Sequence, residues 1–283
     1  MQKNLTIVAV DTANHQLTAR AIEQTVQVTG ASRVLVLSDQ DIYPGSEWHR
    51  IEPISQIEYS RVVLKDLAPL VTTDHYMVVQ YDGMPIDSTR WKDEFLDYDY
   101  IGAPWPWHPD GHQVGNGGFS IRSRRLAELC QDSRVVFNPP GYGTENFMED
   151  THICHLYRDL LASQGMTWAP TSLAREFSAE IPAGRLPTYG FHGTLCLPYY
   201  LDNDHMEFYI NTMRDEQFMS VTHRRLVYGL YLSARWELLE LMLDRAVQVD
   251  PEFKTRLLAQ IAQEQYHYRN LNVEDMADLL INY

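Results

Sequence analysis

Cysteine is scarce in this chain, with Cys130, Cys154 and Cys196 the only three in 283 residues. Their number is odd, their spacing is irregular, and no two form a Cys-x-x-Cys pair. The pattern therefore predicts neither a disulfide framework nor a zinc site. A reducing compartment suits this usage, and we expect a cytoplasmic protein.

Long apolar runs are also missing. No stretch approaches the ~20 apolar residues that a helix needs to cross a bilayer. The opening MQKNLTIVAVD has too short an apolar part for a signal peptide and is typical of a strand. We therefore expect no transmembrane segment.

Basic residues are in deficit, with 23 Lys and Arg against 38 Asp and Glu, which gives a net charge of −15. A surface of this charge repels phosphate backbones, so non-specific binding to nucleic acid is excluded for the molecule as a whole. A local basic groove stays compatible with it. The length suits one large α/β domain, or a domain with an appendage.

Several catalytic motifs are absent. No Gly-x-Ser-x-Gly elbow is present, which argues against an α/β-hydrolase. The glycine-rich residues 115–118 match neither Gly-x-Gly-x-x-Gly nor a P-loop, so a classical dinucleotide or Walker site is not predicted. His152 and His155 lack the His-Glu-x-x-His spacing, and we expect them on a helix surface or as satisfied core residues.

The order of elements indicates the fold class. Residues 4–10 and 33–39 are apolar and strand-like, and 16–28 between them has helical spacing. This βαβ opening predicts adjacent parallel strands joined by a right-handed crossover. We expect a further short strand within 51–57 and a helix over 59–70.

A strand at 76–80 ends in Gln80-Tyr81-Asp82-Gly83, and further elements follow it. We expect a strand at 117–121, a helix from Glu149 to about Ser163, and an almost entirely helical chain after residue 204. The longest helical run spans 221–249. We therefore predict an α/β domain over residues 1–203 and a helical extension over 204–283, which packs on the acceptor side or forms a dimer.

Two segments at the ends of predicted strands can present groups to a ligand. Asp82, between a strand and a glycine, can bind a divalent cation, although Asp-Gly is equally a common turn pair. The glycines at 115–118 allow close backbone approach to a ligand, or serve a tight strand entry.

Glu149 and Asp150 offer a general base for a hydroxyl. Neighbours on a helix point about 100° apart, so at most one of them faces a given pocket. The alternative is that both are helix N-terminal acids. His192, between glycines, is a candidate metal ligand or phosphate contact, or else an exposed loop residue.

Aromatic side chains near residue 100 can stack on a sugar or a base. Trp105 and Trp107 flank Pro106 in a loop-like arrangement that favours a binding wall. For Tyr98 and Tyr100 we expect core packing.

The order of these segments resembles a glycosyltransferase-like family with the GT-A fold. The resemblance covers about residues 4–195, and many members of that family sit in bacterial surface-polysaccharide loci. It is carried by QYDG at 80–83, DYIGAPW at 99–105, GNGGFSIR at 115–122, Glu149-Asp150 and FHG at 191–193. The stretches at 99–105 and 115–122 are its specific part.

The resemblance implies a nucleotide-sugar donor and a divalent cation, manganese or magnesium. Gln80, Tyr81 and Asp82 stand where GT-A enzymes carry Asp-x-Asp, so Asp82 inherits the metal role. Gln80 departs from that motif with a neutral amide, which can still hydrogen-bond a ribose or sugar hydroxyl. His192 matches the late histidine that completes the metal or diphosphate site.

Further roles follow from the same resemblance. Asp150, or else Glu149, corresponds to the base of inverting members. Asp11 and Thr12 would lie near the base and ribose of the nucleotide. The loop with Asn116, Gly117 and Gly118 would face donor sugar and acceptor. Lys65 would contact the nucleotide or its phosphates, and Lys65 or Arg122 would neutralise the leaving group.

The sequence thus predicts a metal-assisted glycosyltransferase, a hexosyl- or pentosyltransferase of the inverting kind. The alternative is a non-catalytic module that binds nucleotide-sugar or glycan, and Gln80 is the feature that favours it. A nucleotidyltransferase is disfavoured because residues 11–15 lack a glycine-rich basic loop. A glycan is the expected acceptor, ahead of a modified nucleotide or DNA base, and the helical extension suggests a homo-oligomer.

Overall fold

The chain is described here by a computed structural model that covers residues 4–105, 111–142, 147–180, 186–218, 220–253 and 255–256. It divides into two compact units. The first is Met1–Ser178 with Thr188–His192, and the second is Ala179–Pro187 with Gly193–Tyr283. The sequence-based boundary between residues 203 and 204 stays a prediction, because compact units are defined by contacts and not by independent folding.

A six-stranded sheet forms the centre of the first unit. Its strands are β1 (Leu5–Val10), β2 (Arg33–Ser38), β3 (Glu47–Arg50), β4 (His75–Val78), β6 (Tyr100–Ile101) and β7 (Ser120–Ser123). Their order is β3-β2-β1-β4-β7-β6. The first four are mutually parallel, whereas β7 runs antiparallel to both β4 and β6.

Helices α1 (His15–Thr29), α2 (Gln56–Lys65) and α3 (Arg124–Leu129) connect or follow these strands. The predicted βαβ opening is confirmed, since β1, α1 and β2 occur in that order and the two strands are parallel. Gly30 ends α1 in the left-handed conformation with φ of 63°, and its amide donates to the Val26 carbonyl. The predicted α/β class with helices at the C-terminal end is confirmed by this element order.

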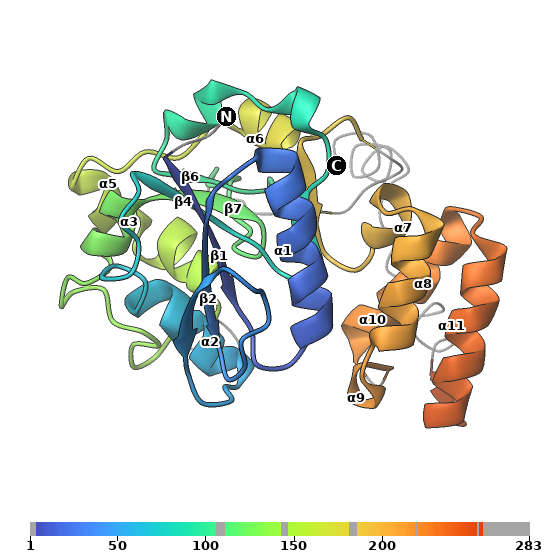
Figure 1. Cartoon of the computed structure of the whole chain (residues 1–283). Helices are drawn as coiled ribbons and strands as arrows, with labels where there is room; N and C mark the ends of the chain where they lie inside the picture. Colours follow the sequence, from blue (N-terminus) through green and yellow to red (C-terminus); the bar gives the residue numbers. More distant parts are fainter. Residues whose placement is uncertain are drawn as a thin grey trace. The chain divides into compact units, whose positions relative to one another are not determined.

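The sheet is covered on both faces, and alternate residues of β1 supply the two cores. Ile7 packs in the cluster that holds Ile22 of α1, whereas Val8 belongs to the cluster with Val62 of α2. Figure 1 shows α1 and α2 on opposite sides of the central strands. Strands buried on both faces explain the nearly continuous apolar runs of β1 and β2.

One predicted strand was wrong. We expected it within 51–57, but the edge strand β3 ends at Arg50 and α2 begins at Gln56. Ser55 caps that helix, since its hydroxyl accepts from the Glu58 amide while the Glu58 carboxylate accepts from the Ser55 amide. This capping box starts the helix at Gln56, so the apolar residues 54 and 57 do not belong to a strand.

A second, three-stranded sheet has the order β5-β9-β8. Its strands are β5 (Gly83–Pro85), β9 (Gly190–His192) and β8 (Ser178–Ala179). The pairing of β5 with β9 is antiparallel and sets Gly83 opposite His192. This pairing brings the late histidine beside the segment that follows β4.

The helix predicted from Glu149 is present but has three parts. They are α4 (Glu149–Thr151), a π-helical segment η4 (His152–Leu156) and α5 (Arg158–Ser163). Shorter elements of the same unit are η1 (Ser88–Arg90), η2 (Asp93–Leu96) and α6 (Thr171–Phe177). A π-helical turn directly after an acidic pair is an arrangement often found at functional sites.

After Gly193, the helices and strands described in the second unit are all helices. It contains α7 (Leu197–Tyr200), α8 (Asn203–Thr212), α9 (Asp215–Phe218), α10 (Val221–Leu232) and α11 (Trp236–Val249). The predicted run over 221–249 is therefore two helices, because Ala234 adopts φ of 55° and ends the first of them. The last predicted helix, after residue 272, lies outside the described residues.

Among the described helices, none is both long and apolar enough to cross a membrane.

Because both faces of the sheet are buried, shortening one buried side chain should destabilise the protein. Leu35 of β2 is 0% exposed, so Leu35→Ala should lower the free energy of unfolding by about 2–5 kcal/mol, through lost transfer energy and a cavity. Urea unfolding measures this. Ile57→Ala on α2, where the side chain is 43% exposed, is the matched control and should stay within about 0.5 kcal/mol. Equal losses in the two variants would contradict the core assignment.

Candidate functional site

The predicted residues gather where β4 ends and β7 begins. Because these strands are antiparallel, Val78 pairs with Ser120. The segment 80–82, which leaves β4, therefore lies beside the loop 116–119, which enters β7. Sheet edges where parallel strands end are the common location of ligand sites in α/β folds.

Asp82 and His192 form the first part of this site. The Oδ1 atom of Asp82 lies 3.9 Å from Nε2 of His192, across the β5–β9 pairing. The Asp82 side chain is 8% exposed. Burial raises the pKa of Asp82, and the nearby His192 opposes that rise. A nearby cation would favour the ionised form of this buried carboxylate.

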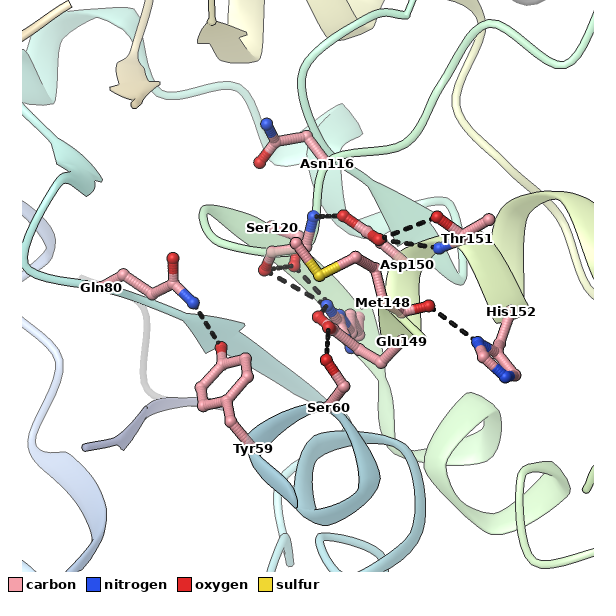
Figure 2. A network of polar contacts seen from close by, with 12 residues as sticks. Tyr59, Ser60, Gln80, Asn116, Ser120, Met148, Glu149, Asp150, Thr151 and His152 are labelled. Carbon is pink, nitrogen blue, oxygen red and sulfur yellow. Dashed lines mark hydrogen bonds and ion pairs between the residues drawn. The ribbon is translucent and has the colours of Figure 1, made fainter. Parts of the chain in front are cut away.

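His192 is held by two amides. Nδ1 of His192 lies 2.9 Å from Asn116 Nδ2, and Nε2 lies 3.1 Å from Gln80 Oε1. Gln80 Nε2 in turn donates to the hydroxyl of Tyr59 at 2.7 Å, as Figure 2 shows. With the amides in this orientation Nδ1 accepts, so the proton of the neutral imidazole is on Nε2.

Asn116 carries a feature that points to a ligand. The residue is 2% exposed and adopts φ of 60°, and its Oδ1 is buried without a hydrogen-bond partner. Buried polar atoms are nearly always paired, so an orphan acceptor beside His192 indicates a donor group that a ligand would supply.

The donor set fits one kind of metal site. Among the residues that the structure describes, no three His, Cys, Asp or Glu side chains gather as a metal cage. Asp82 provides one possible ligand, and the Gln80 carbonyl oxygen lies next to His192. The imidazole would become a second ligand if a cation replaced the proton on Nε2. Magnesium-like cations are commonly held by one or two carboxylates together with substrate phosphates. These residues fit a cation whose remaining ligands come from a substrate.

Asp150 lies on the other side of the 116–119 loop. Its Oδ2 accepts the Gly117 amide at 2.7 Å and its Oδ1 accepts the Thr151 amide at 2.7 Å (Figure 2). Desolvation, followed by the negative charge of Glu149, raises the pKa of Asp150 to about 7. A carboxylate with such a pKa is suited to take up a proton near neutral pH.

Glu149 has a different environment from its neighbour, as helix geometry predicts. It is 3% exposed, and its Oε1 accepts from Nη2 of Arg122 at 2.8 Å. The Ser60 hydroxyl lies 3.4 Å from its Oε2. Arg122 is 0% exposed. Arg122 has no exposed surface for a direct contact with a leaving group, and its predicted neutralisation of that group stays a prediction.

Gly117 and Gly118 are needed for close approach, but to the protein's own side chains. A Cβ on Gly118 would lie 2.1 Å from His192 Nε2 and 2.5 Å from Gln80 Oε1. A Cβ on Gly117 would lie 2.1 Å from Glu149 Oε1. The two glycines thus let His192 pack against the loop at Gly118 and Glu149 pack against it at Gly117.

Asp11 and Thr12 lie at the end of β1, as predicted, but their side chains are engaged. Asp11 Oδ1 accepts the amides of Ala13 and Asn14 at 2.5 and 2.6 Å, and Oδ2 accepts from Thr18. Thr12 Oγ1 accepts the Ile54 amide at 3.0 Å. Both residues shape the start of α1, and a nucleotide contact for them stays a prediction.

Lys65 and Tyr81 are placed less centrally. Lys65 Nζ donates to the Cys130 carbonyl, at the end of α3, so its ammonium is engaged with that helix and not with the Asp82 or Asp150 cluster. Tyr81 is half-buried. A phosphate contact for Lys65 is a prediction that this placement does not support.

The aromatic wall expected at Trp105 is wrong. Trp105 is 7% exposed and its ring stacks on His155 at 5.6 Å between centroids. Trp107 lies outside the described residues. Tyr100 is buried, as expected. His152 is a satisfied core residue, since its Nδ1 bonds the Met148 carbonyl at 2.7 Å and its Nε2 accepts the Asn138 amide at 3.1 Å.

Residues 49–192 match a protein family described as "Protein of unknown function (DUF5672)". The match covers half of the chain, and the chain belongs to this family. No curated protein matches it in sequence.

Three solved structures resemble the fold at low identity. A glycosyltransferase involved in the glycosylation of the major capsid of PBCV-1 is 12% identical with a TM-score of 0.43, over 66% of this chain and 92% of that one. The mannosyltransferase PcManGT from Pyrobaculum calidifontis, in complex with GDP-Man and Mn2+, is 10% identical with a TM-score of 0.41, over 99% and 79%. The apo-form glycosyltransferase GlyE of Streptococcus pneumoniae TIGR4 is 13% identical with a TM-score of 0.42, over 90% and 64%. Scores this low transfer no residue roles, so the account of the site rests on the chain's own contacts.

The spacing around Gly118 predicts that Gly118→Ala disturbs His192. The added methyl must displace the imidazole or the Gln80 amide, so the nitrogen chemical shifts of the His192 ring should change and the melting temperature should fall. In Gly45→Ala, φ is 88° and nothing lies within 4 Å of the added methyl, so this variant can lower the melting temperature through backbone strain but should leave the His192 signals unchanged. An unchanged His192 signal in Gly118→Ala would refute the contact.

The raised pKa of Asp150 predicts a pH-dependent stability. Its folded pKa of about 7 exceeds the ordinary value of 3.8, so between these values the folded state keeps a proton that the unfolded state has released. Stability should therefore fall as pH rises through this window, by at most about 4 kcal/mol. Asp150→Asn should remove this component, and unfolding by urea at pH 5 and pH 8 measures it.

Asp132→Asn is the control. The Arg134 side chain lowers the pKa of Asp132 to about 2, and the Asp132 side chain is 28% exposed. Its small contribution is lost only in acid, below the ordinary pKa of 3.8, so this variant should keep the wild-type difference in stability between pH 5 and pH 8. If Asp150→Asn showed the same pH dependence as wild type, the raised pKa would be contradicted.

Proposed function

We propose that this protein is a glycosyltransferase that moves a sugar from a nucleotide-sugar to an acceptor hydroxyl. In this proposal Asp150 is the general base, and Asp82 and His192 hold a divalent cation together with the donor's diphosphate. The observation that carries it is the geometry of Asp150, whose two oxygens accept backbone amides, with Gly117 and Gly118 between it and the Asp82–His192 pair. Desolvation and the charge of Glu149 raise the pKa of Asp150, which suits this role.

Asp150 performs the proton transfer. Its carboxylate accepts the proton of the acceptor hydroxyl as that oxygen attacks the anomeric carbon, and the bond to the nucleoside diphosphate breaks. Direct displacement of this kind inverts the configuration. The Gly117 and Thr151 amides fix both carboxylate oxygens, so the base is oriented before the acceptor arrives.

Asp82 and His192 act on the leaving group. A bound manganese or magnesium ion would supply neutralisation of the diphosphate charge. Gln80 replaces a carboxylate of the Asp-x-Asp pattern, and Tyr59 holds its amide so that the carbonyl oxygen faces His192. Asn116 Oδ1 can accept a hydroxyl of the donor sugar.

The alternative is a non-catalytic module that binds nucleotide-sugar or glycan. Gln80 favours it, since an amide adds no negative charge for a metal. Against it stands Asp150, a half-buried carboxyl that accepts two backbone amides and whose pKa is raised to about 7, as a general base requires.

The residues of this site all belong to the first unit, within the catalytic domain proposed for residues 1–203. We propose a hydroxyl of a glycan as the acceptor. With a net charge of −15, duplex DNA is a poorer partner than a small or neutral acceptor. Residues 204–283 are proposed to support a homo-oligomer.

A donor screen tests the proposal. UDP-, GDP-, dTDP- and CMP-sugars are each added with and without manganese, and both the melting temperature and donor turnover are measured. One donor should raise the melting temperature in a metal-dependent way. Asp82→Asn should lose this metal-dependent shift, because the carboxylate that would bind the cation is removed.

Asp150→Asn should keep the donor-induced shift but lose turnover by about 10²–10⁴-fold, since only the base is removed. Wild-type kcat should rise with pH through about 7, where Asp150 becomes ionised. Asp132→Asn, on an exposed loop, should behave as wild type in both assays. Donor binding without turnover in the wild type, at any pH and with any hydroxyl acceptor, would favour the binding module instead.

A further inference from the structure

Arg122 is the largest side chain buried completely in the described structure. Its Nε donates to the Ser120 hydroxyl at 3.0 Å, and its Nη2 donates to Glu149 at 2.8 Å and to the Gly117 carbonyl at 3.2 Å. Its guanidinium carbon lies 5.3 Å from the centre of the Tyr100 ring. The residue touches no ligand surface, yet it reaches the loop that bears the proposed base.

Gly117 links this buried pair to Asp150. Its carbonyl oxygen accepts from Arg122 and from the Ser120 hydroxyl, at 3.2 and 3.1 Å. Its amide donates to Asp150 Oδ2 at 2.7 Å. Because the two polar groups of one residue are fixed from opposite sides, movement of the guanidinium would move the amide that orients Asp150.

We propose that Arg122 and Glu149 are a positioning pair, which holds Gly117 and thereby sets the place and the protonation of Asp150. This inference rests on the proposed function. It assigns Glu149 no proton transfer of its own, although the sequence offered Glu149 and Asp150 as alternative bases. The pair acts on the reaction only through Asp150.

A contribution to stability does not explain the Arg122–Glu149 pair. A buried ion pair loses solvation on both partners, and hydrophobic residues of equal volume are often as stable or more stable. Here the cost includes Nη1 of Arg122, which is buried without a partner. We infer that the pair serves to fix the position of the 116–119 loop, to which Arg122 donates at the Gly117 carbonyl.

The charges that face Asp150 are few. Glu149 raises its pKa and Arg122 lowers it. The other titratable groups that act on it are Tyr59, Tyr100, Tyr142 and Cys154. Burial raises the pKa of each of these four, that of Cys154 to about 12, so all are neutral near pH 7. Among the described residues, Glu149 and Arg122 are therefore the two charges that shift the pKa of Asp150.

The test begins with Glu149→Gln, which keeps the shape and removes the charge. The unpaired Arg122 should then lower the midpoint of the kcat–pH profile by about one unit, as a nearby opposite charge does. The carboxyl carbon signal of Asp150, followed by NMR against pH, should move by the same amount. Glu128→Gln, in an exposed ion pair with Arg124 of the same length, 2.8 Å, is the matched control and should move neither.

The double variant Arg122→Met with Glu149→Gln separates position from charge. Both charges are removed, so the midpoint should return toward the wild-type value. The lost support of Gly117 should lower kcat by about 10–100-fold, with little change in the KM for donor. Ser120→Ala is a milder variant for the case that the double variant does not fold, and should lower kcat several-fold while the Asp150 titration stays in place.

Two results would overturn the positioning role. One is a complete loss of turnover in Glu149→Gln at every pH while the Asp150 titration is unmoved, which would make Glu149 the base. The other is an Asp150 carboxyl signal that is identical in wild type, Glu149→Gln and the double variant. If wild type itself shows no turnover, the proposed function fails, and the NMR titration still decides whether the pair controls Asp150.

Discussion

A guanidinium with no exposed surface requires a counter-charge, and in this protein Arg122 finds it in Glu149. The two side chains come from β7 and α4, which are separated in the sequence by α3 and residues 130–148. Once they pair, the 116–119 loop is fixed above them through Gly117, and Asp150 is fixed to that loop. The Asp82–His192 pair is then set on the other face of the same loop, because Gly118 leaves no space between them.

The sheet topology makes this convergence possible. The antiparallel strand β7 beside β4 brings the loop 116–119 to the segment that carries Asp82. The separate pairing of β5 with β9 adds His192 from near the end of the first unit. Two neighbouring carboxylates thereby have different partners within one site: Asp150 accepts two backbone amides and its pKa is raised to about 7, whereas Glu149 accepts from Arg122. Sites with acids in unlike environments are the usual means by which a fold performs proton transfer near pH 7.

Much of the fold could be predicted from the sequence, because its signals are local. Apolar strands, helical spacing and the left-handed Gly30 defined the βαβ opening, and Asp82 was recognised as a carboxylate at a strand end. The choice between Glu149 and Asp150 was not predictable, since it depends on Arg122, whose burial arises only when β7 pairs with β4. Trp105 was misassigned for a similar reason: its loop-like sequence concealed a ring stacked on His155. Lys65 followed from a resemblance alone, and its contact with Cys130 places it away from the two acidic clusters.

The most direct test of the account is a crystal structure of the protein with manganese and the nucleotide-sugar that it binds. The account predicts the diphosphate and the cation at Asp82 and His192, with the donor sugar between them and the Asp150 carboxylate. It also predicts that the Arg122–Glu149 pair remains closed beneath Gly117. A donor bound at another edge of the sheet, or a sugar on the side of the loop remote from Asp150, would contradict it.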